Sequence, residues 1–140
     1  MPSPRTHGFT LIEIMIVVVI IGILGAMIIP NVIGRDDQAR VKVARADLAA
    51  VGTALDMYKL DNFQYPSTDQ GLEALVAKPS GFPEPKNYNP DGYLKKIPVD
   101  PWGGPLVYIS SGGKFELHSL GADGKEGGEG YDADISFDEL

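Results

Sequence analysis

The strongest pattern along the chain is an unbroken apolar stretch near the N-terminus. From residue 9 to residue 29 every position is apolar or glycine except Thr10 and Glu13. An α-helix rises about 1.5 Å per residue, so this stretch would reach about 31 Å, enough to cross the hydrocarbon core of a bilayer. The pattern predicts a membrane-spanning helix with one carboxylate close to its start.

The next segment has a different pattern. Its apolar residues recur at alternating spacings of three and four, which is the period of one helix face; they are Val41, Ala44, Leu48, Val51, Leu55 and Tyr58. We expect one long helix from residue 9 to about residue 60, apolar all round in its first half and amphipathic in its second. Pro30 has no backbone N–H, so a kink or local melting is expected there.

The remaining residues predict short elements joined by loops. Ser67 and Gln70 have the spacing of a helix capping box, and Pro79 would end a short helix in which Leu72, Leu75 and Val76 face inward. A loop rich in Pro, Gly and Asn covers residues 79–92. Residues 106–109 and 114–118 flank the turn Ser-Ser-Gly-Gly, which predicts a β-hairpin. The predicted class is α+β, with one long helix packed on a small antiparallel sheet.

Composition argues against several classes of function. The 140 residues fit one modest domain with an appendage. Residues 41–140 hold 16 acids against 9 Lys or Arg, and no basic cluster is present, so nucleic acid is not an expected partner. Without cysteine, disulfides and thiolate metal sites are excluded. The only histidines are His7 and His118, so a catalytic centre based on histidine is not supported and we expect no enzyme.

One alternative for the apolar stretch is a cleaved secretory signal peptide, with Arg5 before it. The stretch is longer than the usual apolar region of about 7 to 15 residues, and no small-x-small cleavage site stands at its end, where Pro30, Asn31 and Val32 follow. We therefore expect it to be retained. Cations both precede and follow it, so charge alone leaves its orientation open.

The sequence "GFTLIEIMIVVVIIGILGAMIIP" resembles the N-terminus of type IV pilins and of the pseudopilins of bacterial type II secretion. The resemblance implies that residues 1–8 are a leader, cut by a prepilin peptidase between Gly8 and Phe9, and that the new N-terminal Phe9 is methylated. It also implies that residues 9–30 are the transmembrane and assembly half of the helix, and residues 31–140 a periplasmic globular domain. Pro30 would be a weak point that helps the subunit leave the bilayer.

An ionised carboxylate in hydrocarbon is costly and by default suggests a function. No cation lies in the segment, so our hypothesis is that Glu13 pairs with the freed amine of Phe9 on a neighbouring subunit and sets register during assembly. The alternative is a carboxylate that reaches the lipid headgroups near a helix end.

Three further phrases, "LDMYKLDNFQYPSTDQGLEALV", "GYLKKIPVDPWGGP" and "SLGADGKEGG", look like the major pseudopilins of type II secretion. The resemblance implies a structural subunit, anchored in the inner membrane, that polymerises with itself into a periplasmic fibre and helps to export folded proteins. Minor pseudopilins, an inner-membrane assembly platform and inner-membrane lipid would be further partners. Opposite charges on Asp56 and on Lys95 or Lys96 are candidate contacts between subunits.

In that family a calcium ion clamps the C-terminal loop. Residues 120–134 offer several acids among glycines, and Ca²⁺ prefers hard oxygen ligands on a turning backbone. The order is not that of an EF-hand, because Lys125 and Gly127 occupy the third and fifth positions when Asp123 is counted as the first. The resemblance suggests side-chain ligands from Asp123, Asp132 and Asp134, and carbonyl ligands from Leu120, Lys125 and Gly128. The alternative is a solvated acidic tail.

Two other functions remain open at this point. A type IV pilus subunit for adhesion or motility belongs to the same superfamily, although such pilins usually close a C-terminal loop with a disulfide and this chain has no cysteine. A signal-anchored binding module would keep an unprocessed N-terminus.

Overall fold

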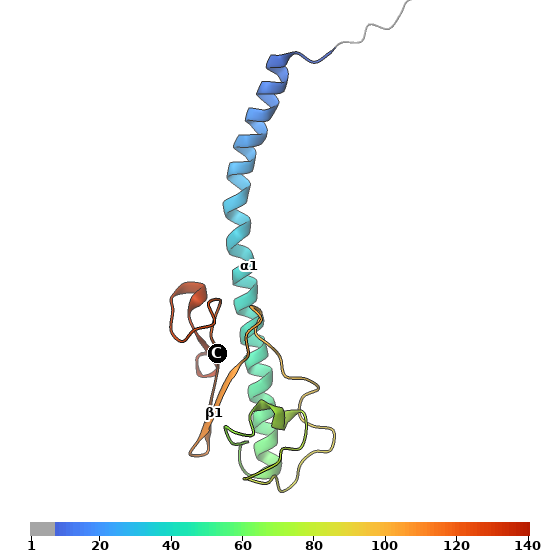
Figure 1. Cartoon of the computed structure of the whole chain (residues 1–140), viewed down its shortest axis with the longest axis vertical. Helices are drawn as coiled ribbons and strands as arrows, with labels where there is room; N and C mark the ends of the chain where they lie inside the picture. The colour runs from blue at the N-terminus through green and yellow to red at the C-terminus, as the bar shows by residue number, and fades with distance from the viewer. Residues whose placement is uncertain (1–7) are drawn as a thin grey trace, which may run out of the picture. The chain divides into compact units, whose positions relative to one another are not determined.

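The computed structural model describes residues 8–140, without the side chains of residues 28–35. The chain divides into two compact units, Met1–Asp36 and Asp37–Leu140. The elements in chain order are the helix α1 (Leu11–Asn62), the 3₁₀ helix η1 (Leu72–Leu75), the strands β1 (Val107–Ser111) and β2 (Lys114–Ser119), the 3₁₀ helix η2 (Gly130–Asp132), the strand β3 (Ile135–Ser136) and the 3₁₀ helix η3 (Phe137–Glu139). Figure 1 shows that within the second unit the strands and the C-terminal segment lie along α1.

The long helix is confirmed, with α1 covering 52 residues. Helical backbone continues through Pro30, so the expected local melting there is wrong; a kink stays a prediction. In the first unit the apolar side chains of residues 11–24 are exposed. Among the residues whose side chains the structure describes, no helix is both long and apolar enough to span a membrane.

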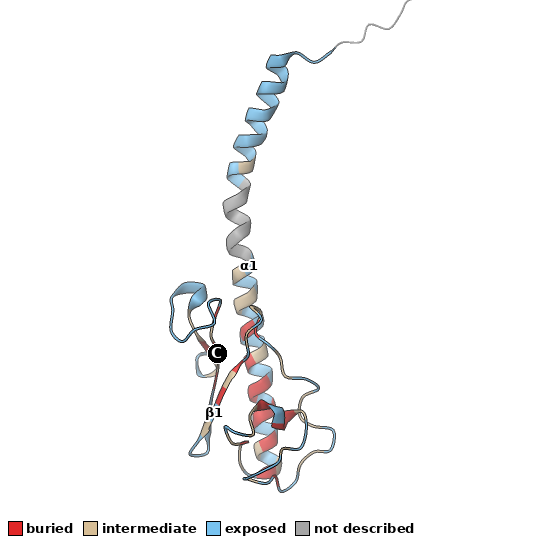
Figure 2. Ribbon diagram, in the orientation of Figure 1, coloured by how far each residue is buried: buried red, intermediate tan, exposed pale blue. Residues whose placement is uncertain are grey.

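The amphipathic half of α1 supplies the spine of the core, as its spacing predicts. Ala44, Leu48, Val51 and Leu55 are completely buried, and Val41 packs against the same cluster. Figure 2 shows this buried stripe on the part of α1 that the sheet and loops cover. Gly52 belongs to the packed face because a Cβ there would overlap the ring of Phe137. The C-terminal segment therefore packs directly on the helix.

The prediction of a helix over residues 67–79 is wrong in helix type and length, because only the short 3₁₀ helix η1 forms there. The capping box itself forms, since the Gln70 N–H donates to Ser67 Oγ at 3.1 Å and the Ser67 N–H donates to Gln70 Oε1 at 3.0 Å. Gly71 then adopts a φ of 63°, a left-handed value that a right-handed helix cannot continue. The result is a turn followed by the single 3₁₀ turn of η1. Leu72 and Leu75 are buried as expected, and Val76 is half-buried.

The sheet has the antiparallel order β1-β2-β3, and Tyr108 lies opposite Leu117. The hairpin is confirmed, but its turn is shorter than predicted, because β1 extends to Ser111. Gly112 and Gly113 alone make the turn, with φ values of 60° and 79°. Two successive positive φ angles are those of a type I′ turn, whose twist matches that of paired strands.

The C-terminal end of α1 is closed by a cluster that we call the aromatic end: Tyr58, Asn62, Tyr88 and Tyr93. The Tyr58 ring centroid lies 5.3 Å from that of Tyr93 and 6.2 Å from that of Tyr88. The Asn62 amide donates to the Tyr58 carbonyl at 3.0 Å and to the Tyr93 hydroxyl at 3.1 Å. Its Oδ1 accepts the Asn87 N–H at 2.9 Å. A buried amide thus fastens a loop 25 residues away to the helix end.

Candidate functional site

The helix start is built around Thr10 and Glu13. The Glu13 N–H donates to Thr10 Oγ1 at 3.3 Å, and the Thr10 N–H donates to Glu13 Oε2 at 3.2 Å. The Thr10 hydroxyl also donates to Glu13 Oε2, at 3.4 Å. This reciprocal pairing is a capping box, which satisfies N–H groups that the first helical turn leaves without partners. Glu13 therefore has a partner inside its own chain, which the sequence reasoning missed although the spacing Thr-x-x-Glu signals it.

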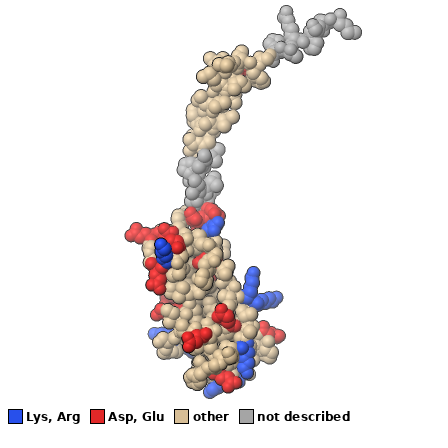
Figure 3. Space-filling model, in the orientation of Figure 1, with Lys and Arg blue, Asp and Glu red and all other residues tan. Residues whose placement is uncertain are grey.

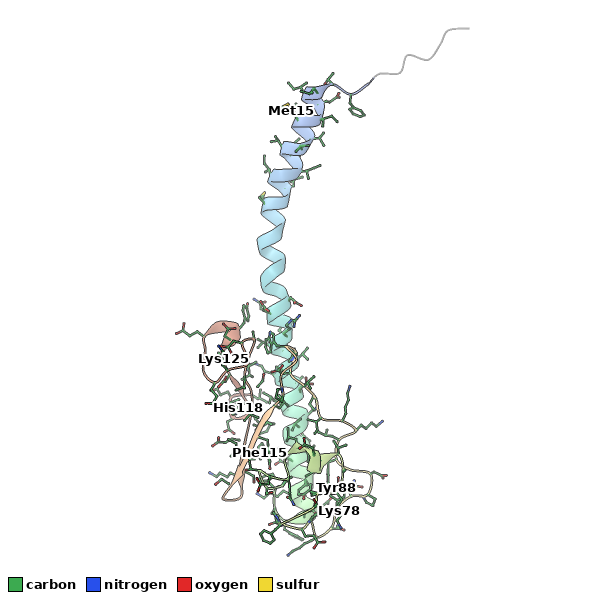
Figure 4. All side chains as sticks on the ribbon, viewed as in Figure 1. Met15, Lys78, Tyr88, Phe115, His118 and Lys125 are labelled. Atoms are coloured by element: carbon green, nitrogen blue, oxygen red, sulfur yellow. The ribbon has the colours of Figure 1, made fainter. Side chains whose placement is uncertain are left out.

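Around the capping box the surface is apolar. Phe9, the predicted mature N-terminus, has an 80% exposed side chain and follows the exposed Gly8. Leu11, Ile12 and Met15 are exposed on the first turns of α1, and Figure 4 shows Met15 near the start of the helix. Pro30 lies where side chains are not described. The structure thus places Gly8, Phe9 and Glu13 together at one exposed helix end.

The second candidate region is the C-terminal loop, residues 120–134. Its two limbs are joined by backbone hydrogen bonds: the Ala122 N–H donates to the Tyr131 carbonyl at 2.9 Å and the Asp134 N–H donates to the Gly127 carbonyl at 3.2 Å. The Gly127 N–H donates in turn to Asp134 Oδ2 at 3.0 Å. Gly121 has a φ of 66°, and a Cβ there would lie 2.7 Å from the Asp132 and Ala133 carbonyl oxygens. The loop is a closed, glycine-dependent turn.

The structure brings some of the predicted calcium ligands close to one another through the backbone. Gly128 packs so tightly on the Asp132 carbonyl that a Cβ would overlap it. Asp123 Oδ1 accepts the Lys125 N–H at 3.0 Å, and Figure 4 shows Lys125 on this loop. Within the described residues, however, no three acidic or histidine side chains gather closely enough to hold a metal ion by themselves. Any ion here would depend on backbone carbonyls.

One carboxylate oxygen of the loop stands out. Three buried side-chain polar atoms in the described part of the chain have no hydrogen-bond partner: Tyr88 Oη, Trp102 Nε1 and Asp134 Oδ1. The first two belong to neutral groups. Asp134 Oδ1 belongs to an acid, for which burial without a partner costs more. An oxygen of this kind is a candidate ligand for a cation.

A turn at residues 100–104 borders the same loop, and the sequence reasoning did not single it out as a site. Asp100 is 3% exposed. It begins the "DPWGG" run, whose Asp, Pro and Gly residues are a turn signal. This turn and residues 120–124 line a cavity of about 320 Å³. The cavity therefore adjoins the predicted ligands Leu120 and Asp123.

The charge distribution matches the predicted acidic loop. Figure 3 shows Asp and Glu side chains gathered over the C-terminal loop. Elsewhere, Asp56 Oδ1 accepts the Tyr65 hydroxyl at 2.8 Å, while Lys95 and Lys96 are exposed. Their pairing between subunits stays a prediction. His118 is half-buried on β2, next to Leu117 in sequence.

Comparison with known proteins shows the family of the chain. A family model described as "Type II secretion system (T2SS), protein G" matches residues 31–138, and one described as "Prokaryotic N-terminal methylation motif" matches residues 3–29. The type II secretion system core protein G of Pseudomonas aeruginosa is 68% identical over 137 residues, 96% of each chain. That of Vibrio cholerae is 55% identical over 133 residues, 94% of this chain and 90% of the relative.

A solved structure gives the same result. The crystal structure of the major pseudopilin from the type 2 secretion system of enterohaemorrhagic Escherichia coli aligns with a TM-score of 0.69 and 43% identity, covering 79% of this chain and 96% of that chain. A capped long helix, packed by its second half on a three-stranded antiparallel sheet, defines a pilin-like structural subunit.

This chain belongs to the protein G family of type II secretion systems. The predicted type IV pilin-like fold and the predicted function as a major pseudopilin are confirmed by these relatives. The family is one of structural subunits rather than of enzymes.

Proposed function

We propose that this chain is the major structural subunit of a type II secretion pseudopilus, which polymerises from the inner membrane into a periplasmic fibre and helps to export folded proteins across the outer membrane. The observation that carries the proposal is the contrast within α1, whose residues 11–24 expose their apolar side chains whereas the stripe from Ala44 to Tyr58 is buried. An exposed apolar surface of this size needs a partner. Lipid would cover it before assembly, and neighbouring subunits afterwards.

The first step of the proposal is processing. A prepilin peptidase would cut after Gly8, and the new amine of Phe9 would be methylated. The methylation motif at residues 3–29 and the exposure of Gly8 and Phe9 support this step. Intact mass and N-terminal sequencing of the protein extracted from membranes would test it. An N-terminus at Met1 in assembled fibres would contradict it.

The second step is assembly by way of Glu13. Thr10 donates two hydrogen bonds to one oxygen of the Glu13 carboxylate, Oε2. In the proposal the carboxylate also pairs with the Phe9 amine of a neighbouring subunit, which offsets the cost of a charge in an apolar layer. Minor pseudopilins and an inner-membrane assembly platform are the further partners that we propose for fibre initiation and growth.

Glu13→Gln separates the two roles of Glu13. Glutamine can fill the same position of a capping box, so the helix start should be kept while the charge is lost. We expect processed but poorly assembled subunits, measured as the fibre fraction after shearing. Glu13→Ala, which loses both roles, is the reference for complete failure. Normal fibres from Glu13→Gln would leave capping as the whole function of this residue.

The third part of the proposal is a calcium ion in the C-terminal loop. Carboxylates of Asp123, Asp132 and Asp134 and carbonyls of Leu120, Lys125 and Gly128 would hold it. The residues fit such an ion, because Asp134 Oδ1 is buried without a partner and hard oxygen donors suit Ca²⁺. A bound ion would offset the repulsion among the acids and join the two limbs of the loop. A melting temperature of the full chain that is the same in calcium and in EGTA would contradict this part.

A further inference from the structure

Asp100 is a buried carboxylate outside every predicted ligand set. Its Oδ1 accepts the backbone N–H groups of Trp102 at 3.1 Å and Gly104 at 2.7 Å. Its Oδ2 accepts the Ser119 hydroxyl at 3.0 Å. An ionised carboxylate only accepts hydrogen bonds, so the Ser119 proton must point towards Asp100.

Ser119 connects Asp100 to the C-terminal loop through a second hydrogen bond. It is completely buried at the end of β2. Because its proton is directed at Asp100, its lone pairs are free to accept, and the Gly121 N–H donates to Ser119 Oγ at 3.4 Å. That distance is long for a hydrogen bond of this type. The contact therefore depends on the Ser119 hydroxyl proton pointing towards Asp100 and not towards the Gly121 N–H.

The Gly121 N–H and the Leu120 carbonyl belong to the same peptide unit. A trans peptide is planar, so its N–H and its C=O point in opposite directions. When Ser119 holds the N–H, the Leu120 carbonyl is aimed to the other side. Gly121 also lies against the returning limb of the loop, close to the Asp132 and Ala133 carbonyl oxygens.

We propose that Asp100 is a positioning residue for the calcium loop and acts through Ser119 to aim the Leu120 carbonyl at the ion. The inference rests on the proposed calcium site. The turn that carries Asp100 is itself fastened to α1, because Arg40 Nη1 donates to the Pro101 carbonyl at 2.8 Å. Arg40 of α1 and Ser119 of β2 thus both hydrogen-bond to the turn that carries Asp100.

The decisive variant is Asp100→Asn, which keeps the size of the side chain. Its Oδ1 can still accept from Trp102 and Gly104, but its amide would donate to Ser119 and turn the hydroxyl proton away, towards the Gly121 N–H. Loss of a group that orients a metal ligand weakens metal binding about 10- to 100-fold. We expect that fold-change in the calcium dissociation constant of the full chain in detergent, measured by calorimetric titration with Ca²⁺.

Trp102 offers a second readout, since it is the only tryptophan and lines the cavity beside Leu120 and Asp123. Its fluorescence should change during calcium titration of the unaltered chain, with a midpoint shifted to higher calcium in Asp100→Asn. A purely structural role of Asp100 would lower the melting temperature in EGTA but leave both calcium readouts unchanged.

Asp91→Asn is the matched control, because Asp91 is exposed and loses the same charge. Ser119→Ala tests the next step of the chain and decides the matter if Asp100→Asn does not fold. Equal affinity in Asp100→Asn and the unaltered chain would overturn the inference, as would equal weakening by Asp91→Asn. If the unaltered chain binds no calcium, the proposed calcium loop fails first, and the positioning role falls with it.

Discussion

The aromatic end and the C-terminal loop belong to the same unit but are held together by different means. At the aromatic end, Tyr58 is 1% exposed and contacts two other rings, one edge-on and one tilted. The buried amide of Asn62 joins the end of the helix to Asn87 and Tyr93. In the loop, residues 122–132 are exposed, and the limbs are joined by a few backbone hydrogen bonds.

The two regions therefore differ in whether they need a bound ion to be stable. Buried apolar area stabilises the aromatic end without any external group. An exposed, acidic, glycine-rich loop has little apolar area to bury and its charges repel one another. We therefore expect cations to change the stability of the loop. The stability of the aromatic end should depend instead on the packing of its side chains and on the protonation of its tyrosines.

The largest effect should follow from Leu48→Ala in the buried stripe. Leu48 is completely buried, and removing such a side chain typically costs about 2 to 5 kcal/mol. Urea unfolding of the full chain in detergent measures this loss, and the exposed Leu60→Ala is the control. If the folded Leu48→Ala protein lost calcium affinity as well as stability, the buried stripe and the C-terminal loop would not be independent of each other.

Removal of the calcium ion that we propose for the C-terminal loop should have the next largest effect on stability. A ligand at 100 times its dissociation constant stabilises by about 2.7 kcal/mol, and EGTA would remove that contribution. Amide hydrogen exchange should rise across residues 122–130 and stay unchanged across residues 44–58. Equal deprotection of both segments would show that the loop is not a separate unit of stability.

Asn62→Ala should cost about 1 to 3 kcal/mol, because it leaves buried hydrogen-bonding groups without partners. Asn87→Ala is a matched control, since Asn87 contributes only its backbone N–H to this contact. Thermal unfolding of both variants in EGTA excludes a contribution from calcium. Equal losses would show that the buried amide is not what ties the loop to the helix.

The smallest effect on stability, judged at pH 10, should come from ionisation of the tyrosines. Burial, with the neighbouring phenols Tyr93 and Tyr88, raises the pKa of Tyr58 to about 12, and burial likewise raises the pKa of Tyr108 to about 12. The folded state thus favours the neutral phenol, so stability is full below the unfolded pKa of about 10 and is lost as the pH rises from 10 towards 12. Denaturant midpoints at pH 8, 10 and 11 would measure this loss. Tyr58→Phe should weaken the dependence, and an unchanged slope would contradict the assignment.

Local order could be read from the sequence wherever neighbours along the chain decide it. The stripe from Ala44 to Tyr58 follows from helical spacing, and the hairpin from two short runs that flank the turn containing Gly112 and Gly113. The same rule applied to residues 67–79 failed in kind, because Gly71 takes a left-handed conformation directly after a correctly formed capping box. The capping box of Thr10 and Glu13 follows the same spacing rule, Thr-x-x-Glu, but was not predicted.

Candidate sites were predictable only in part. The resemblance indicated Gly8, Phe9 and Glu13, and the structure places them at one exposed helix end. It also indicated the acids of the C-terminal loop. Composition did not indicate that Asp134 would keep a buried oxygen without a partner, because that depends on how the two limbs fold over each other.

By itself the sequence determined the elements whose causes are local: an apolar stretch, an amphipathic stripe, two capping boxes and a glycine turn, each set by residues within a few positions of one another. Tertiary structure alone decided which distant residues meet. Asp100 reaches Ser119 across 19 positions and Asn62 reaches Tyr93 across 31. Such contacts leave no periodic trace along the chain, because a buried polar group takes whichever partner the packed core brings to it.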